Sequence, residues 1–128
     1  MQTTIYKHTL AKPNGASISK EIVTTAIPVQ ETAKQYKVLA IQTEELNNPF
    51  LMTTHPVSVC REGQIIKKTE IDKLESSWDW AVYSTSDNPQ ILKDLIFDHL
   101  YTKVANLEKK LSEKKQFIED LHSKLNGT

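Results

Sequence analysis

The sequence predicts an α+β protein: a small, mainly antiparallel β-sheet or partly open barrel over residues 1–87, followed by a long C-terminal helix over residues 88–128 that forms a coiled coil. Two observations predict this class. Residues 1–87 are rich in β-branched and aromatic side chains and are interrupted by turn residues at short intervals. After them, apolar residues recur every three or four positions in a run that is otherwise charged or polar. The length of 128 residues, with 38% hydrophobic residues, suits one modest core.

The first half of the β-rich part contains three predicted strands. The run "TTIYKHTL" predicts the first, and "KPNG" at residues 12–15 predicts a reverse turn after it, since proline presets φ and Asn-Gly tolerates positive φ. A second strand is expected over residues 16–23. The compact apolar run "YKVLAIQT", residues 36–43, predicts a central strand, and "NNP" at 47–49 ends the connection that follows it.

The second half predicts a hairpin, a short helical turn and a strand. In "VSVCREGQIIKK", residues 57–68, two alternating runs flank a reversal at Gly63. Thr69 and Asp72 form a near match to a capping box, which predicts one or two helical turns. The run "SWDWAVYS", residues 77–84, then predicts an extended strand.

Aromatic side chains of that strand give a candidate binding surface. Alternation places Trp78, Trp80 and Val82 on one face and Asp79, Ala81 and Tyr83 on the other. Paired indoles can stack on sugars or bases, so Trp78, Trp80 and Tyr83 are candidate binding residues. Strand alternation explains the spacing of the tryptophans without a ligand, which favours a role in the core.

The long helix has clear signals at both ends. Asn88 is a suitable N-cap and Pro89 suits the first helical position, where a missing N–H costs nothing. The pair Asn126-Gly127 predicts a stop in the left-handed conformation. The helix would run for about 37 residues, or about 55 Å.

A narrow apolar seam runs along residues 97–125 of this helix. Heptad position a falls on Phe97, Val104, Leu111, Ile118 and Leu125, and position d on Leu100, Leu107, Lys114 and Leu121. We call these nine residues the seam. All except Lys114 are apolar, and a stripe only two residues wide in seven is typical of a coiled coil. Upstream, a broader apolar face is expected to pack on the sheet; it comprises Ile91, Leu92, Leu95 and Ile96.

A second copy of the chain is the partner that the seam favours. Residues 1–87 form too small a core to cover the seam as well, and no other helix of similar length is predicted. The alternatives are a helix folded back along its own sheet and an unrelated partner helix. Val104 and Ile118 at a, with leucine at d, favour a parallel dimer, while Phe97 and Leu111 at a leave a trimer open. In a parallel pair, Lys103 would attract Glu108 while Lys110 would repel Lys115, so flanking charges do not decide orientation.

Several classes of site find no support in the sequence. Lys+Arg and Asp+Glu both number 16, with no basic stripe for nucleic acid or anionic lipid, and no apolar run approaches a membrane span or an export signal. The four histidines and Cys60 share no metal-ligand spacing, so no metal or cofactor is expected. Cys60 lacks a recognisable base and reads as a half-buried strand thiol, and three glycines cannot build a phosphate-binding loop. No catalytic residue is predicted.

The segments "PVSVCREGQIIKKTEID" and "WDWAVYSTSDNP", followed by a terminal coiled coil, resemble small uncharacterised proteins of phages and prophages of low-GC Gram-positive bacteria, encoded between tail and lysis genes. The resemblance lies in the layout of the chain. It implies a virion-associated or tail-assembly accessory role and transfers no catalytic residue.

Two function classes follow, with an enzyme as a distant third. One is a homo-oligomeric structural or assembly protein that presents its β-domain several times on a coiled coil, with itself and another protein as partners. The other is a soluble binding module or inhibitor that captures a host protein or small ligand near Trp78 and Trp80. The expected location is the cytoplasm, or the virion if the protein is phage-encoded.

Overall fold

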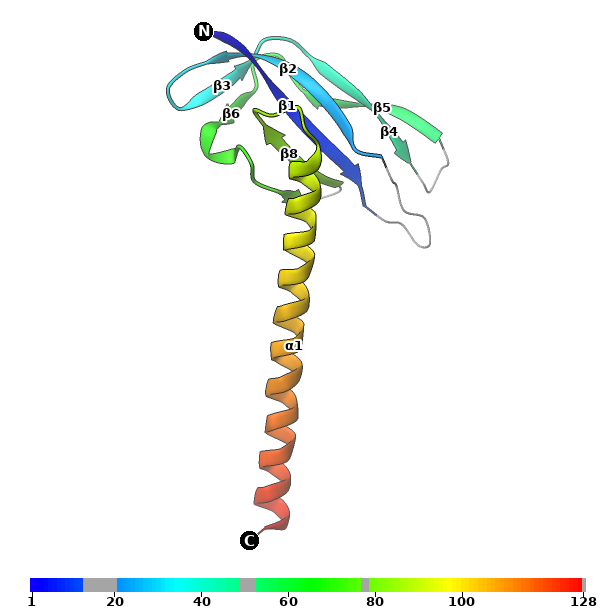
Figure 1. Cartoon of the computed structure of the whole chain (residues 1–128), viewed down its shortest axis with the longest axis vertical. Coiled ribbons are helices and arrows are strands. Elements are labelled where there is room, and N and C mark those ends of the chain that lie inside the picture. Colours follow the sequence, from blue (N-terminus) through cyan, green and yellow to red (C-terminus); the bar gives the residue numbers. More distant parts are fainter. Residues whose placement is uncertain (13–20, 49–52, 77–78, 128) are drawn as a thin grey trace. The chain divides into compact units, whose positions relative to one another are not determined.

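The computed structural model describes residues 1–12, 21–48, 53–76 and 79–127. It divides into two compact units, Met1–Leu95 and Ile96–Thr128. The first unit is an antiparallel sheet curled into a half-barrel, and one long helix follows it in the chain (Figure 1). The predicted α+β class, with a partly open barrel and a long C-terminal helix, is therefore confirmed.

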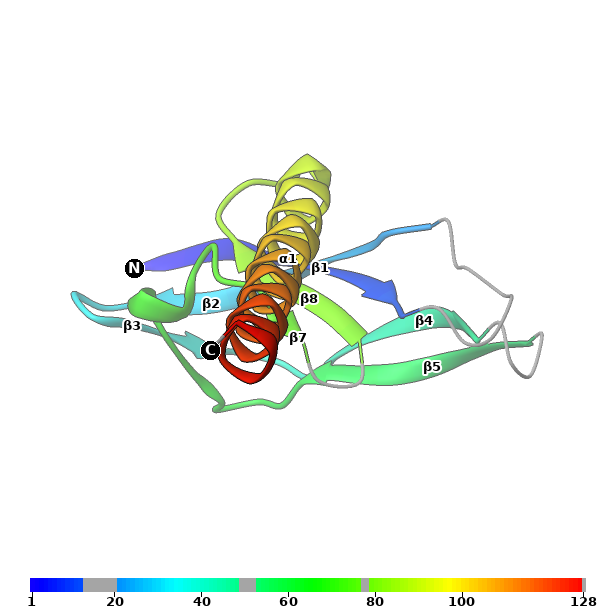
Figure 2. The same ribbon diagram turned by 90° about the horizontal axis from the view of Figure 1, so that it is seen from below.

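Eight strands are present among the described residues of the first unit. Six of them form one antiparallel sheet in the order β6-β3-β2-β1-β8-β7: β1 Gln2–Ala11, β2 Val23–Glu31, β3 Gln35–Val38, β6 Ile65–Lys67, β7 Glu75–Ser76 and β8 Asp79–Ser84. The other two, β4 Gln42–Asn48 and β5 Thr53–Cys60, pair as a separate antiparallel ribbon. The ribbon extends to one side of the sheet (Figure 2).

The core fills the inner side of the curled sheet. Ile5 of β1 faces Ile27 of β2 across the ladder, and both are fully buried. The buried cluster takes residues from both sheets: Ile5, Ile27, Val29, Tyr36, Val38, Val59, Cys60, Ile66 and Tyr83. The end of the ribbon thus completes the core of the larger sheet.

The first predicted strand is confirmed, but the second prediction is wrong in extent. The predicted turn at "KPNG" and most of the predicted strand at 16–23 lie outside the described residues. Glu21 and Ile22 precede the strand, which starts at Val23 and runs to Glu31. Pro28 lies inside it, and its carbonyl accepts the N–H of Leu39 at 3.0 Å.

The predicted central strand at 36–43 is two strands that belong to different sheets. Successive backbone N–H groups in this run bond to different parts of the chain: Val38 N–H donates to the Gln64 carbonyl and Leu39 N–H donates to the Pro28 carbonyl. Ile41, in the break, is 64% exposed. β4 then starts at Gln42 and runs through Asn47, where the sequence predicted the end of the connection.

The predicted hairpin at 57–68 contains the expected turn but is not a hairpin. Gly63 has φ of 82°, and Gln64 N–H donates to the Arg61 carbonyl at 3.0 Å. The two flanking strands do not pair with each other. β5 pairs with β4, whereas β6 pairs with β3, with Tyr36 opposite Ile66. The turn therefore connects two sheets.

The predicted helical turn after this strand is present as a short 3₁₀ helix, η1, at Lys68–Glu70. The predicted capping role of Asp72 is wrong. No side chain in the described part of the chain caps η1, and Asp72 lies beyond it with φ of 61°, a conformation that aspartate tolerates better than most residues. Its N–H donates to the Tyr83 carbonyl at 2.8 Å, which ties the turn to β8.

The connection from β8 to the helix is ordered by a relay of side-chain bonds, each reaching two residues forward. Ser84 Oγ accepts Ser86 N–H at 3.1 Å, Ser86 Oγ accepts Asn88 N–H at 3.2 Å, and Asn88 Oδ1 accepts Gln90 N–H at 3.0 Å. Such bonds satisfy backbone donors where no ladder partner exists. The predicted N-cap Asn88 is confirmed by this geometry.

Helix α1 spans Gln90–Asn126, one residue shorter at its start than predicted. Its end at Asn126 agrees with the prediction, but the expected left-handed stop at Gly127 is wrong, because the positive φ angles among the described residues are those of Asp72 and Gly63. Gly127 N–H instead bonds to the Ser123 carbonyl at 2.9 Å. A Cβ at Gly127 would lie 2.6 Å from that oxygen, so a larger residue at this position would clash with the backbone of Ser123. Near the start of α1, Leu92 is fully buried.

Candidate functional site

The seam of α1 is the main unpartnered apolar feature of the described residues. Its apolar side chains range from 37% exposed at Leu100 to 71% exposed at Leu125. Every residue from Leu100 to Gly127 is exposed, Lys114 included. Exposed apolar residues scattered singly are common, but a row of eight at heptad spacing is a contiguous surface that water solvates poorly.

Two exposed aromatic residues that the sequence reasoning did not assign flank the seam. Tyr101 at position e is 71% exposed and Phe117 at position g is 65% exposed. The Tyr101 ring stacks on Phe97 with centroids 6.4 Å apart. Heptad numbering alone would have placed both beside the seam, so the signal was present in the sequence.

Some polar side chains elsewhere on α1 bond to one another along the helix. Gln116 Nε2 donates to Asp120 Oδ1 at 3.0 Å, and Asn126 lies within hydrogen-bond distance of His122. These are i,i+4 pairs, the spacing at which helix side chains meet. The seam, by contrast, is apolar at every position except Lys114.

The candidate surface of Trp78, Trp80 and Tyr83 is not assembled as one site. Trp78 lies outside the described residues, and Trp80 is half-buried with Lys12 Nζ 5.9 Å from its ring centroid. Tyr83 is buried in the core cluster, on the opposite face of β8 from Trp80. Burial raises the pKa of its phenol to about 12, so the hydroxyl stays protonated in the core. Tyr83 as a surface residue is therefore a wrong prediction.

β8 is covered on both faces, which the alternating pattern did not predict. Ala81, Val82, Tyr83 and Ser84 are all buried. His8, opposite Val82, is fully buried as well; its Nε2 donates to the Ser86 carbonyl at 2.9 Å and its Nδ1 lies 2.8 Å from Thr24 Oγ1. Because a carbonyl can only accept, the Nε2 proton is fixed, and His8 serves as a cross-link within the fold.

Cys60 is more deeply buried than the predicted half-buried thiol. It is 2% exposed, and burial raises the pKa of its thiol, partly offset by the backbone of Gln42. A protonated, enclosed thiol is a weak nucleophile. Among the described residues, no three His, Cys, Asp or Glu side chains gather closely enough to hold a metal ion.

A buried carboxyl group at Glu44 is the feature that sequence reasoning missed. Glu44 on β4 is 7% exposed and accepts a hydrogen bond from Thr25 Oγ1 of β2 at 3.1 Å. Burial raises the pKa of this carboxyl, which the Thr25 bond and the positive charge of Lys7 partly offset. No local pattern in "QTEEL" singles out Glu44, because its burial depends on packing of β4 against β2.

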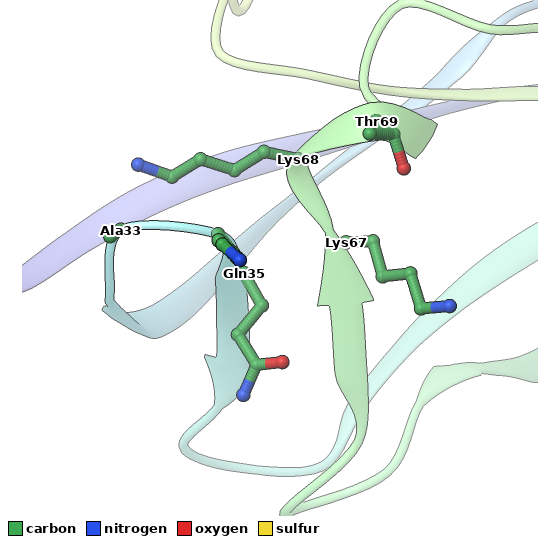
Figure 3. Close-up of a pocket in the computed structure, with 6 residues that line it drawn as sticks. Ala33, Gln35, Lys67, Lys68 and Thr69 are labelled. Carbon is green, nitrogen blue, oxygen red and sulfur yellow. The ribbon is translucent and has the colours of Figure 1, made fainter.

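A shallow pocket of about 520 Å³ lies between the β2–β3 turn and the start of η1 (Figure 3). It is lined by Ala33, Lys34, Gln35, Lys67, Lys68 and Thr69. Lys67 and Lys68 point in different directions (Figure 3). Lys68 Nζ is 2.6 Å from Glu31 Oε2, so its charge already has a partner. Lys67 and Lys68 therefore do not converge on one point where an anion could bind.

No helix among the described residues is long and apolar enough to cross a membrane. Comparisons of the chain with family models, curated proteins and solved structures found no match. The exposed seam of α1 is therefore the strongest structural indication of function in the described residues.

Proposed function

We propose that this chain is a non-enzymatic, homo-oligomeric structural or assembly protein. Residues 97–125 pair with a second copy as a coiled coil, and the β unit supplies the surface that is presented more than once. The observation that carries the proposal is the solvent exposure of all eight apolar seam residues along α1. Burying such side chains against a copy gains roughly 1.5–3 kcal/mol for each one fully buried.

Presentation in multiple copies gives this arrangement a use. Linked copies of one surface bind a repetitive target with a gain in avidity that needs no new contact. A virion or tail, the setting implied by the resemblance to phage proteins, is built of repeated subunits. The further partner would then be a repeated protein surface, and the role would be accessory or assembly-related.

Light scattering and sedimentation of the full chain at micromolar concentration test the oligomer. Val104→Glu places a charge in the seam, and the expected result is loss of the oligomer with the β unit still folded. Ala105→Glu is the matched control, since it adds the same charge one position further on, at heptad position b. A monomeric mass for the unmodified chain, or equal effects of the two variants, would contradict the proposal.

A binding module or inhibitor is the second candidate. It now depends on Trp80, which is half-buried and close to Lys12, because Tyr83 belongs to the core. Binding of a host protein or small ligand near Trp80 would change indole fluorescence, and Trp80→Phe would remove that change. Retention of full binding by Trp80→Phe would rule this site out.

A further inference from the structure

We infer that the second copy on the seam is parallel and in register, so that each seam residue faces its own counterpart and Lys114 faces Lys114. This inference rests on the proposed function and adds the identity, direction and alignment of the partner helix. It predicts a two-stranded coiled coil with one polar layer.

The distribution of apolar residues favours the parallel alignment. In register, nine layers form, and only the Lys114 layer is polar. In an antiparallel pair, position a faces position d, and two alignments pair eight of the nine seam residues. One sets Lys114 against Leu111 twice and places Phe97 opposite residue 128, beyond the end of α1 at Asn126. The other sets Lys114 against Val104 twice and places Leu125 opposite Lys93. Each therefore sets a lysine against an apolar residue in two layers and leaves one seam residue without a seam partner.

The shapes of the seam residues agree with two parallel strands. Val104 and Ile118 are β-branched at a, while Leu100, Leu107 and Leu121 occupy d. This choice favours parallel dimers over higher assemblies, because the a and d knobs enter their holes in different directions.

The single lysine in the seam argues for a copy rather than an unrelated helix. Lys114 is exposed, and its stem can lie along Leu111 and Ile118 while the ammonium group reaches water. Only a partner with a polar residue at the same layer avoids setting this lysine against an apolar side chain. A second copy in register meets that condition without any further requirement.

Flanking charges supply a direct test of direction. In the parallel pair, Lys103 faces Glu108 of the copy and Lys110 faces Lys115, giving one attractive and one repulsive contact on each side. In the antiparallel alignment that sets Lys114 against Leu111, Glu108 faces Lys115 instead, and in the one that sets Lys114 against Val104, Lys115 faces Tyr101. Replacing Lys115 by glutamate therefore removes a repulsion between the copies only in the parallel pair.

The first experiment measures dimer dissociation of the full-length Lys115→Glu variant by sedimentation. Parallel pairing converts two repulsions into attractions, and the dissociation constant should fall by roughly fivefold at low salt. The matched control is Lys109→Glu at position f, because both lysines have a glutamate four residues later, Glu113 and Glu119, and lose the same local pair. Weaker association of Lys115→Glu than of Lys109→Glu would overturn the parallel direction.

The second experiment uses disulfide formation in a Cys60→Ser background. The Leu107→Cys and Ile118→Cys variants differ in mass because one carries a tag. Each variant is oxidised alone, and the two are also mixed in reducing buffer, allowed to exchange chains and then oxidised together. Each should form a covalent dimer with itself. Covalent dimers only in the mixture would overturn the parallel direction, because Leu107 faces Ile118 in the antiparallel alignment that sets Lys114 against Leu111.

The remaining outcomes distinguish failure of the parallel, in-register alignment from failure of self-association. An oligomer of unchanged mass without any disulfide overturns the in-register alignment and leaves self-association standing. A three-chain mass overturns the two-stranded assembly. A monomeric mass for the unmodified chain overturns the proposed function together with this inference.

Discussion

Lys114→Leu should make the oligomer more heat-stable while loosening control over its stoichiometry. Lys114 is exposed in the single chain, between seam neighbours Leu111 and Ile118 that are 55% and 53% exposed. A lysine there must send its ammonium group past the interface, so it gives up packing that leucine would supply. Two leucines per dimer could add on the order of 2 kcal/mol, an upper figure because the lysine stems already cover part of the surface.

The opposing effect is loss of ion pairs between Lys114 and acidic residues of the second copy, such as Glu113 or Glu119. All three residues are exposed, and exposed pairs contribute less than about 1 kcal/mol. Burial should therefore exceed the lost pairing. Polar seam residues also restrict register and chain number, so the leucine variant should populate more than one assembly.

Thermal melts at matched protein concentration, followed by circular dichroism, measure the stability change, and sedimentation measures the masses. Lys109→Leu is the control, since it makes the same replacement at position f, outside the seam. The reasoning fails if Lys114→Leu lowers the melting midpoint at unchanged mass. That result would mean that Lys114 does not lie in the interface assigned to it.

Three further predictions concern the β unit and its junction with α1. Glu44→Gln should raise the unfolding midpoint at pH 7. Burial raises the pKa of the Glu44 carboxyl in the folded state above its ordinary value of 4.5. The neutral carboxyl therefore contributes stability below about pH 4.5, and this contribution is lost as the pH rises through the folded-state pKa. Urea titrations should show that Glu44→Gln increases the free energy of unfolding at pH 7 and that this increase vanishes at acid pH. An increase of the same size at every pH would contradict the expected role of the carboxyl. Cys60→Ser should leave the oligomer mass unchanged, and the native thiol should react with a disulfide reagent only as fast as the fold opens; rapid reaction would contradict its burial. Asn88→Ala should lower the free energy of unfolding by about 1 kcal/mol, because the bond from Gln90 N–H to Asn88 Oδ1 is lost. Asn126→Ala is the control, and equal free energies of unfolding for the two variants would show that the Asn88 cap does not contribute.

Features set by neighbouring residues were predictable from the sequence. The cap at Asn88, the glycine turn at Gly63 and the first strand each depend on side chains within a few positions. The 37-residue helix was predictable for the same reason, since propensity and capping act locally. The seam followed from spacing alone.

Features set by distant partners were not predictable. The apolar run at 36–43 has no local break, and it divides because Val38 and Leu39 bond to Gln64 and Pro28. Likewise, the alternation in residues 79–84 assigned side chains to two faces of β8 but did not show that residues 81–84 are buried on both faces. Glu44 became a buried carboxyl only because Thr25 lies beside it on another strand.

The pairing of β1 with β8 also sets the order in which the fold can form. His8 bonds to the Ser86 carbonyl, 78 positions along the chain, and the β1–β8 ladder joins the same two regions. Contacts at such separation are slow to form, because most of the chain must be gathered first. During synthesis β1 and β2 can pair early, yet the open side of β1 stays without its neighbour until residues 79–84 leave the ribosome. Partial chains would therefore expose the edge of β1 until β8 has been made.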